Sequence, residues 1–67
     1  MKQTTIKEIK SGDYFTMKPT EEPTEKQVWV KGEYDRSEKA YWCYRFADVN
    51  SGRLIKAAKV VYTEFYF

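Results

Sequence analysis

Few residues of this chain could carry out covalent chemistry. Its one cysteine, Cys43, has no histidine anywhere in the sequence to activate it. A thiol becomes a good nucleophile when a nearby base or positive charge favours the thiolate. Alternation along residues 40–46 instead places Cys43 in the middle of a strand, where a cysteine is ordinarily an inert packed thiol. The sequence therefore predicts no catalytic cysteine.

Carboxylates and glycines also lack the spacing of an active site. Glu21, Glu22 and Glu25 fall in a polar segment, where like charges are ordinarily solvated. Asp35 and Asp48 fall in turns, where aspartate caps backbone N–H groups. The glycines are isolated and form no phosphate-binding loop, and one thiolate with carboxylates is a poor ligand set for structural zinc. We therefore expect no catalytic, metal or cofactor residues, and a protein that is not an enzyme.

The remaining candidate is a binding surface of aromatic rings and cations. Aromatic residues make up 18% of the chain. Side chains alternate between the two faces of a strand, and in each strand we take the face that carries Lys18, Lys31, Arg45 or Glu64 as the outside. On this rule the interior rings are Phe15, Trp42, Tyr44, Phe46, Phe65 and Phe67, with Tyr34 unassigned. The outward rings are Tyr14, Trp29, Tyr41, Tyr62 and Tyr66, among Lys18, Lys31, Arg36 and Arg45. A bulge at Gly32 would reverse the assignment.

The predicted partner-binding residues are Tyr14, Trp29, Lys31, Arg36, Tyr41, Arg45, Tyr62 and Tyr66. Three interpretations stay open: cover for the outside of the fold, contact with a partner protein or a second copy, and binding of single-stranded nucleic acid. Tyr and Trp are favoured anchors of protein contacts, whereas rings that stack on bases beside cations that meet phosphates suit single-stranded nucleic acid. Of the two binding functions we favour protein contact. The sequence thus predicts a non-enzymatic binding module without a small-molecule cofactor.

Charge and hydropathy limit the kinds of partner and the cellular location that we expect. Twelve basic and ten acidic residues give a net charge of +2, which is too small to indicate a polyanion partner, although a local basic face would suffice. No segment approaches the roughly 20 apolar residues that cross a bilayer, and the first residues lack the apolar run of a signal peptide. A single cysteine suits a reducing compartment. We expect a cytoplasmic protein without a membrane partner.

Short strands separated by turns must position these residues. Ile6 and Ile9, with Thr5 and Glu8 at capping-box spacing, predict one short helical turn that ends near Gly12. A short strand is the alternative for this segment, because Thr and Ile also favour strands, and we favour the turn. Alternating apolar positions predict strands over residues 13–18, 27–34, 40–46, 53–56 and 59–67, and a polar loop over residues 19–26. Together these elements predict an all-β fold, in which one domain over residues 1–67 forms a small, five-stranded, antiparallel, partly open barrel.

Two stretches of sequence add a resemblance. The opening Ile6-x-x-Ile9-x-x-Gly12-Asp13-x-Phe15 resembles the first turn and strand of SH3-like small barrels. The string Val28-Trp-Val-Lys-Gly-Glu-Tyr-Asp-Arg-Ser37, followed by Tyr44-x-Phe46-x-Asp48-Val49-Asn50, is similar to a group of short proteins of gut anaerobic bacteria and their phages or mobile elements. No function is established for that group. The resemblance implies an SH3-like barrel and a bacterial or phage setting, and it transfers no site residue.

Overall fold

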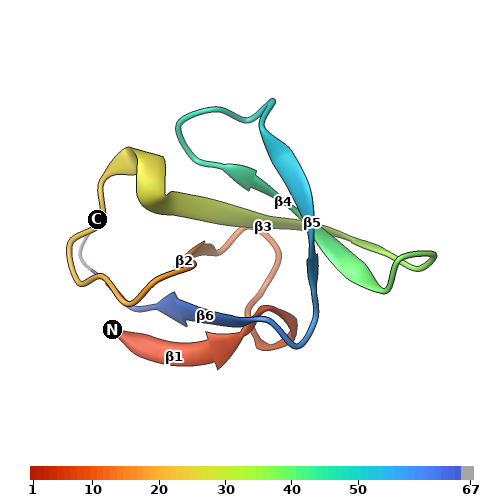
Figure 1. Cartoon of the computed structure of the whole chain (residues 1–67), viewed down its shortest axis with the longest axis horizontal. Coiled ribbons are helices and arrows are strands. Elements are labelled where there is room, and N and C mark those ends of the chain that lie inside the picture. The colour runs from red at the N-terminus through yellow and green to blue at the C-terminus, as the bar shows by residue number, and fades with distance from the viewer. Residues whose placement is uncertain (66–67) are drawn as a thin grey trace.

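Segments rich in β-branched and aromatic residues form strands in the computed structural model, which describes residues 1–65. The strands are β1 (Lys2–Thr5), β2 (Tyr14–Thr16), β3 (Val28–Asp35), β4 (Ala40–Arg45), β5 (Gly52–Lys56) and β6 (Val60–Thr63). Two single-turn 3-10 helices, η1 (Ile6–Glu8) and η2 (Glu25–Gln27), complete the regular structure of these residues. The strands form one antiparallel sheet in the order β1-β6-β2-β3-β4-β5 (Figure 1). The predicted all-β fold is confirmed at this level.

The predicted count of five strands is wrong, because residues 2–5 form a sixth. Lys2 pairs with Thr63 and Thr5 with Val60, so β1 lines the outer edge of β6. The predicted helical turn is present as η1, but Thr5 makes no side-chain cap. Instead, Thr4 donates a hydrogen bond from Oγ1 to the Glu8 carboxylate at 2.9 Å.

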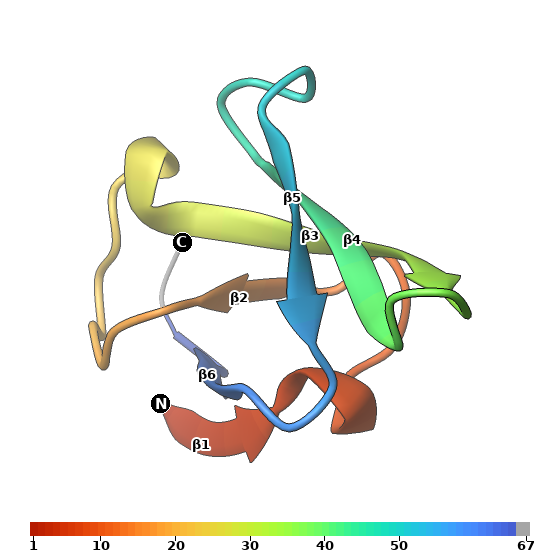
Figure 2. The ribbon, with the colours of Figure 1, turned by 45° about the vertical axis from the view of Figure 1, so that its right-hand side comes forward.

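The sheet curls until its two ends approach each other without closing. The N–H of Ile6 bonds to the C=O of Lys59, and that of Lys7 to the C=O of Ala57, both at 3.1 Å. These bonds attach η1 to the turn between β5 and β6, so the end of β5 lies beside η1 (Figure 2). Within residues 1–65, β1 and β5 remain the two unpaired edges of the sheet.

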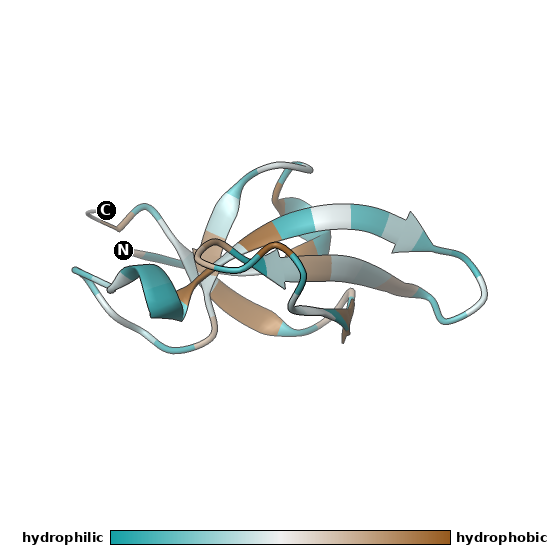
Figure 3. Ribbon diagram, turned by 90° about the horizontal axis from the view of Figure 1, so that it is seen from above, coloured by the Kyte–Doolittle hydropathy of each residue, from teal (hydrophilic) through white to brown (hydrophobic). Residues whose placement is uncertain are grey.

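One face of the curled sheet, here called the inner face, carries the core. Apolar segments gather where the strands cross, while the tip of the β3–β4 hairpin is hydrophilic (Figure 3). Six buried residues form the main cluster, one from η1 and one from each of β2 to β6: Ile6, Phe15, Trp29, Cys43, Ile55 and Val61. The opposite side of the sheet is called the outer face.

The predicted faces of β3 and β4 are reversed. Trp29, expected outside, is only 7% exposed, whereas Trp42, expected inside, is 47% exposed. Tyr41 packs against the inner cluster, and Tyr44 and Phe46 lie half-buried on the outer face. Phe15 is buried as predicted and Phe65 is half-buried, while Phe67 lies outside the described residues.

The cause of the reversal is that lysine and arginine do not mark the outside here. Lys31 is 4% exposed, and its Nζ donates a hydrogen bond to the C=O of Ile9 while lying over the Tyr41 ring at 4.1 Å. A long aliphatic stem can run along apolar surface while its charge finds a carbonyl and a ring face. The inner face therefore holds a cation that sequence alternation assigns to solvent.

The predicted bulge at Gly32 is present. Lys31 pairs with Cys43, but the next pair joins Tyr34 to Tyr41, so β3 contains one extra residue. A Cβ on Gly32 would lie 2.4 Å from the carbonyl oxygen of Trp42, closer than two such atoms can approach. Glycine is required because the backbones of β3 and β4 approach closely here.

The polar loop is more ordered than expected. Most of its residues are exposed as predicted, but Pro23 is buried and residues 25–27 form η2. The capping box expected at η1 occurs here, where the N–H of Thr24 donates to Oε1 of Gln27 at 2.9 Å. This loop reaches the inner-face rim, where the C=O of Lys26 accepts a hydrogen bond from Arg45.

Candidate functional site

The predicted partner-binding residues do not share one face. Trp29, Lys31, Tyr41 and Arg45 lie on the inner face of β3 and β4, because residues paired directly across an antiparallel ladder point the same way. Tyr14 lies on the outer face and is 44% exposed. The remaining members are dispersed: Arg36 in the exposed turn after β3, Tyr62 half-buried on β6, and Tyr66 outside the described residues.

An exposed apolar surface lies on the outer face of β4 and β5 instead. Trp42 pairs directly with Leu54, and Tyr44 pairs directly with Gly52. We call Trp42, Tyr44 and Leu54 the outer patch. Trp42 is its most exposed large side chain, at 47%. The residues of this patch were predicted as interior or not singled out, so alternation alone did not find them.

Two glycines leave the rings of the outer patch uncovered. A Cβ on Gly52 would lie 3.8 Å from Cε3 of Trp42 and 3.9 Å from Cβ of Tyr44. A Cβ on Gly32 would lie 3.2 Å from Cε1 of Tyr44. No side chain therefore covers the indole from position 52, and the Tyr44 ring rests against the bulge. Glycines opposite large rings are the one sequence signal that could have indicated this surface.

The outer face continues toward β2 through a second pair of rings. Tyr14 and Phe46 meet edge to face, with ring centroids 5.3 Å apart. Beneath them Val28 and Val30 are buried, with Val30 paired to both Tyr14 and Tyr44. This packing holds β2, β3 and β4 together on the same face, beside the outer patch.

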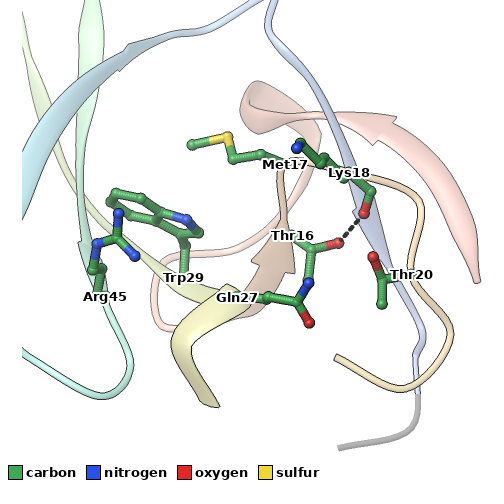
Figure 4. Close-up of a pocket in the computed structure, with 7 residues that line it drawn as sticks. All are labelled: Thr16, Met17, Lys18, Thr20, Gln27, Trp29 and Arg45. Atoms are coloured by element: carbon green, nitrogen blue, oxygen red, sulfur yellow. Dashed lines mark hydrogen bonds between the residues drawn. The ribbon is translucent and has the colours of Figure 1, made fainter. Parts of the chain in front are cut away.

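The rim of the inner face forms a first depression of about 300 Å³. Thr16, Met17, Lys18, Thr20, Gln27, Trp29 and Arg45 line it (Figure 4). The Arg45 guanidinium lies over the Trp29 ring, with Cζ 4.9 Å from the centroid, and its Nη1 donates to the C=O of Lys26 at 3.1 Å. These two contacts fix a cation at the opening, where it can meet a carboxylate or a phosphate.

A second depression of about 370 Å³ lies along β5. Its lining residues are Met17, Arg53, Leu54, Ile55, Lys56 and Lys59, so Met17 borders both depressions. Among residues 1–65, five cations and no carboxylate line the two depressions. We call Lys18, Arg45, Arg53, Lys56 and Lys59 the basic rim. Arg53, Lys56 and Lys59 were missed as a group, although they form a run of cations without an acid between residues 52 and 63.

Two buried titratable groups lie side by side on the inner face. Burial lowers the pKa of the Lys31 ammonium below its ordinary value, against the smaller opposing effects of Cys43 and Asp13. Burial raises the pKa of the Cys43 thiol, against the smaller effects of the Gly32 backbone hydrogen bond and of Lys31. Both shifts favour the neutral forms. Cys43 is fully buried, so it is a packed thiol rather than an accessible nucleophile.

The described residues contain no cluster of three or more Cys, Asp or Glu side chains that could hold a metal ion. Nor does any helix within them have the length and hydropathy to cross a bilayer. In comparisons with known proteins, no family model, curated protein or solved structure matches the chain.

Proposed function

We propose that this domain is a non-enzymatic protein-binding module whose contact surface is the outer patch. The observation that carries the proposal is the exposure of Trp42, 47% of whose surface faces solvent although its strand, β4, has a neighbouring strand on each side. Tryptophan and tyrosine dominate the energetics of protein contacts. Covering the exposed part of this side chain, roughly 100 Å² of apolar surface, would contribute about 2–3 kcal/mol to binding.

The support beneath the outer patch favours binding, because a contact surface that is already ordered loses little entropy on association. Trp42 and Tyr44 lie within β4, which is paired on one side with β3 and on the other with β5. The Tyr44 ring is placed against the Gly32 bulge. A partner would meet Tyr44, which is paired on both sides, and Trp42, which is paired with Leu54 and lies opposite the Gly32 bulge.

The test is affinity capture with immobilised protein and two variants. Trp42→Ala removes the exposed ring, and Tyr34→Ala removes a ring of similar exposure, 49%, near the far end of β3. We expect a protein that the wild type and Tyr34→Ala both retain and that Trp42→Ala loses. The same set of retained proteins for all three baits would contradict the proposal.

Single-stranded nucleic acid is the second candidate ligand, and the basic rim is the observation that favours it. Five cations without a carboxylate could meet successive phosphates. The exposed ring of Trp42 lies on the face opposite Arg45 and Arg53, and Trp29, the ring beneath Arg45, is buried. Base stacking and phosphate contact therefore do not coincide on one surface, which is why protein contact ranks first. Absence of oligonucleotide binding at low salt would remove this candidate.

We also infer that the curled sheet is a partly open SH3-like barrel. The bond from Lys7 to Ala57 supports this inference, since it places η1, which follows the edge strand β1, beside the turn that follows the edge strand β5. Placement in the cytoplasm and a link to phages or mobile elements are likewise proposals, drawn from the single cysteine and from the resemblance of residues 28–50.

A further inference from the structure

The edge of β5 is open, and the direction of its backbone groups can be assigned. The N–H of Arg45 bonds to the C=O of Ser51 at 3.1 Å, in the same register as the β4–β5 ladder. Hydrogen-bonded and non-hydrogen-bonded pairs alternate along an antiparallel ladder. Arg53 and Ile55 therefore bond to β4, and the N–H and C=O of Leu54 point away from it. Within residues 1–65 these two groups have no hydrogen-bond partner.

The two sides of this edge differ in chemistry. On the outer face, Leu54 lies directly across from Trp42, and Gly52 leaves the indole uncovered. On the inner face, Arg53 and Ile55 border the second depression. A strand added beside β5 would place alternate side chains against Trp42 and Leu54 on the outer face and against Arg53 and Ile55 on the inner face, because side chains alternate with a period of two.

Charge indicates the partner of this edge. Residues 52–63 contain Arg53, Lys56 and Lys59 and no carboxylate. The Lys56 ammonium donates to the C=O of Glu38 at 2.9 Å, whereas Arg53 and Lys59 bond to no side chain of the described residues. A second copy of β5 would bring like charges together, since cations on an edge oppose pairing with itself. The partner that complements the charge of this edge is therefore a segment that carries carboxylates.

We propose that β5 accepts an extended acidic segment of a partner protein as an additional strand, with apolar side chains over Trp42 and Leu54 and carboxylates toward Arg53 and Lys59. Backbone bonds to Leu54 would provide affinity, and the two faces would provide specificity, as in other additions of a strand to a sheet edge. The inference rests on the proposed protein-binding function and names the chemistry of the partner.

The probe is a fluorescein-labelled peptide of alternating glutamate and valine, one residue longer than β5 at each end. Three ligands serve as comparisons: the same peptide with alternate backbone nitrogens methylated, a lysine–valine peptide, and an oligothymidylate. We expect saturable binding of the glutamate–valine peptide, with affinity about tenfold lower for the methylated and the lysine peptides, because each loses bonds of roughly 1.4 kcal/mol in total. Arg53→Ala should weaken binding by about the same factor and reduce its salt dependence.

Hydrogen exchange at backbone amides tests the inference in the wild-type protein, so this result does not depend on whether a variant folds. On addition of the peptide, hydrogen exchange at the Leu54 amide should slow, while exchange at Ile55, already bonded to β4, should change little. Equal binding of the methylated peptide, unchanged exchange at Leu54, or tighter binding of the oligothymidylate would overturn the inference. If capture still depends on Trp42 in that case, the protein-binding function stands and only the strand addition fails. If capture does not depend on Trp42, the proposed function itself fails.

Discussion

The guanidinium of Arg45 lies over the indole of Trp29, with Cζ 4.9 Å from the ring centroid. Arg45 is exposed and Trp29 is 7% exposed, although they face each other directly across the β3–β4 ladder. A cation and a core ring thus share one face of the sheet, the cation at the rim and the ring beneath it. The inner face therefore carries a cation at its opening, whereas the outer face carries the exposed indole of Trp42.

Tryptophan fluorescence should report this division directly. In Trp29→Phe the remaining Trp42 should emit at longer wavelength and be quenched readily by acrylamide, because 47% of it faces solvent. In Trp42→Phe the remaining Trp29 should emit at shorter wavelength and resist quenching. Equal quenching of the two variants would contradict the assignment of faces.

Adjacent residues of β5 should differ in their effect on stability. Ile55 is 5% exposed within the inner cluster, so Ile55→Ala should lower the free energy of unfolding by about 2–5 kcal/mol. Leu54 is half-buried on the outer face, and Leu54→Ala should cost about 1 kcal/mol, near the average for a point substitution. Urea unfolding of both variants measures the difference. A larger loss of stability in Leu54→Ala than in Ile55→Ala would contradict the assignment of the core to the inner face.

The two glycines beside the outer patch should tolerate alanine unequally. Gly32→Ala places a methyl group 2.4 Å from a backbone oxygen of Trp42, so about 1–3 kcal/mol of stability should be lost as the bulge shifts. Gly52→Ala meets its nearest atom at 3.4 Å, and its effect should stay within about 1 kcal/mol. Thermal unfolding compares them. Equal melting temperatures would show that β3 and β4 are not in close contact at the bulge.

The fold was largely predictable from the sequence and the orientation of its strands was not. Periodicity of two located five of the six strands, and the Gly32 bulge was recognisable as an isolated glycine within a strand pattern. β1 was missed because Lys2, Gln3, Thr4 and Thr5 contain no large apolar residue, and its stability comes from pairing with β6 rather than from its own pattern.

The outer patch could not be predicted from the sequence for a related reason. Alternation divides a strand into two sets of side chains but does not say which set faces the core. Lys31 suggested that its own set was outside, yet its ammonium is satisfied by the C=O of Ile9 and the Tyr41 ring. Only the tertiary fold brings Ile9 to that position. Consequently Trp29 and Trp42 exchange the roles expected from sequence.

The contribution of Cys43 to the stability of the wild type should decrease at high pH. Because its folded pKa is raised above the ordinary value of 9.0, the folded state keeps a proton that the unfolded state loses above that value. The resulting stabilisation is complete below 9.0 and is lost as pH rises from 9.0 through the folded pKa. Lys31, whose pKa is lowered, contributes with the opposite sign: as pH rises from its folded pKa to 10.5, its contribution to stability increases.

The comparison with Cys43→Ala measures the thiol together with its smaller electrostatic effect on Lys31, because Lys31 is present in both proteins. Relative to the variant, the wild type should keep its stability in urea unfolding below pH 9.0 and lose it as pH rises above that value. Iodoacetamide should also alkylate the native thiol far more slowly than the unfolded one, since Cys43 is fully buried. A native rate near the unfolded rate, or a difference in stability that does not change with pH, would contradict this description.

The affinity of the captured partner protein for three forms of the domain tests the central claim most directly. Isothermal titration would compare the wild type, Trp42→Ala and Tyr34→Ala, the two substituted rings being 47% and 49% exposed. We predict a loss of affinity of about thirtyfold or more for Trp42→Ala, from roughly 2–3 kcal/mol of lost burial, and a change under about threefold for Tyr34→Ala. Equal small effects of the two substitutions, or a wild-type domain that retains no protein at all, would contradict the assignment of the outer patch as a protein-contact surface.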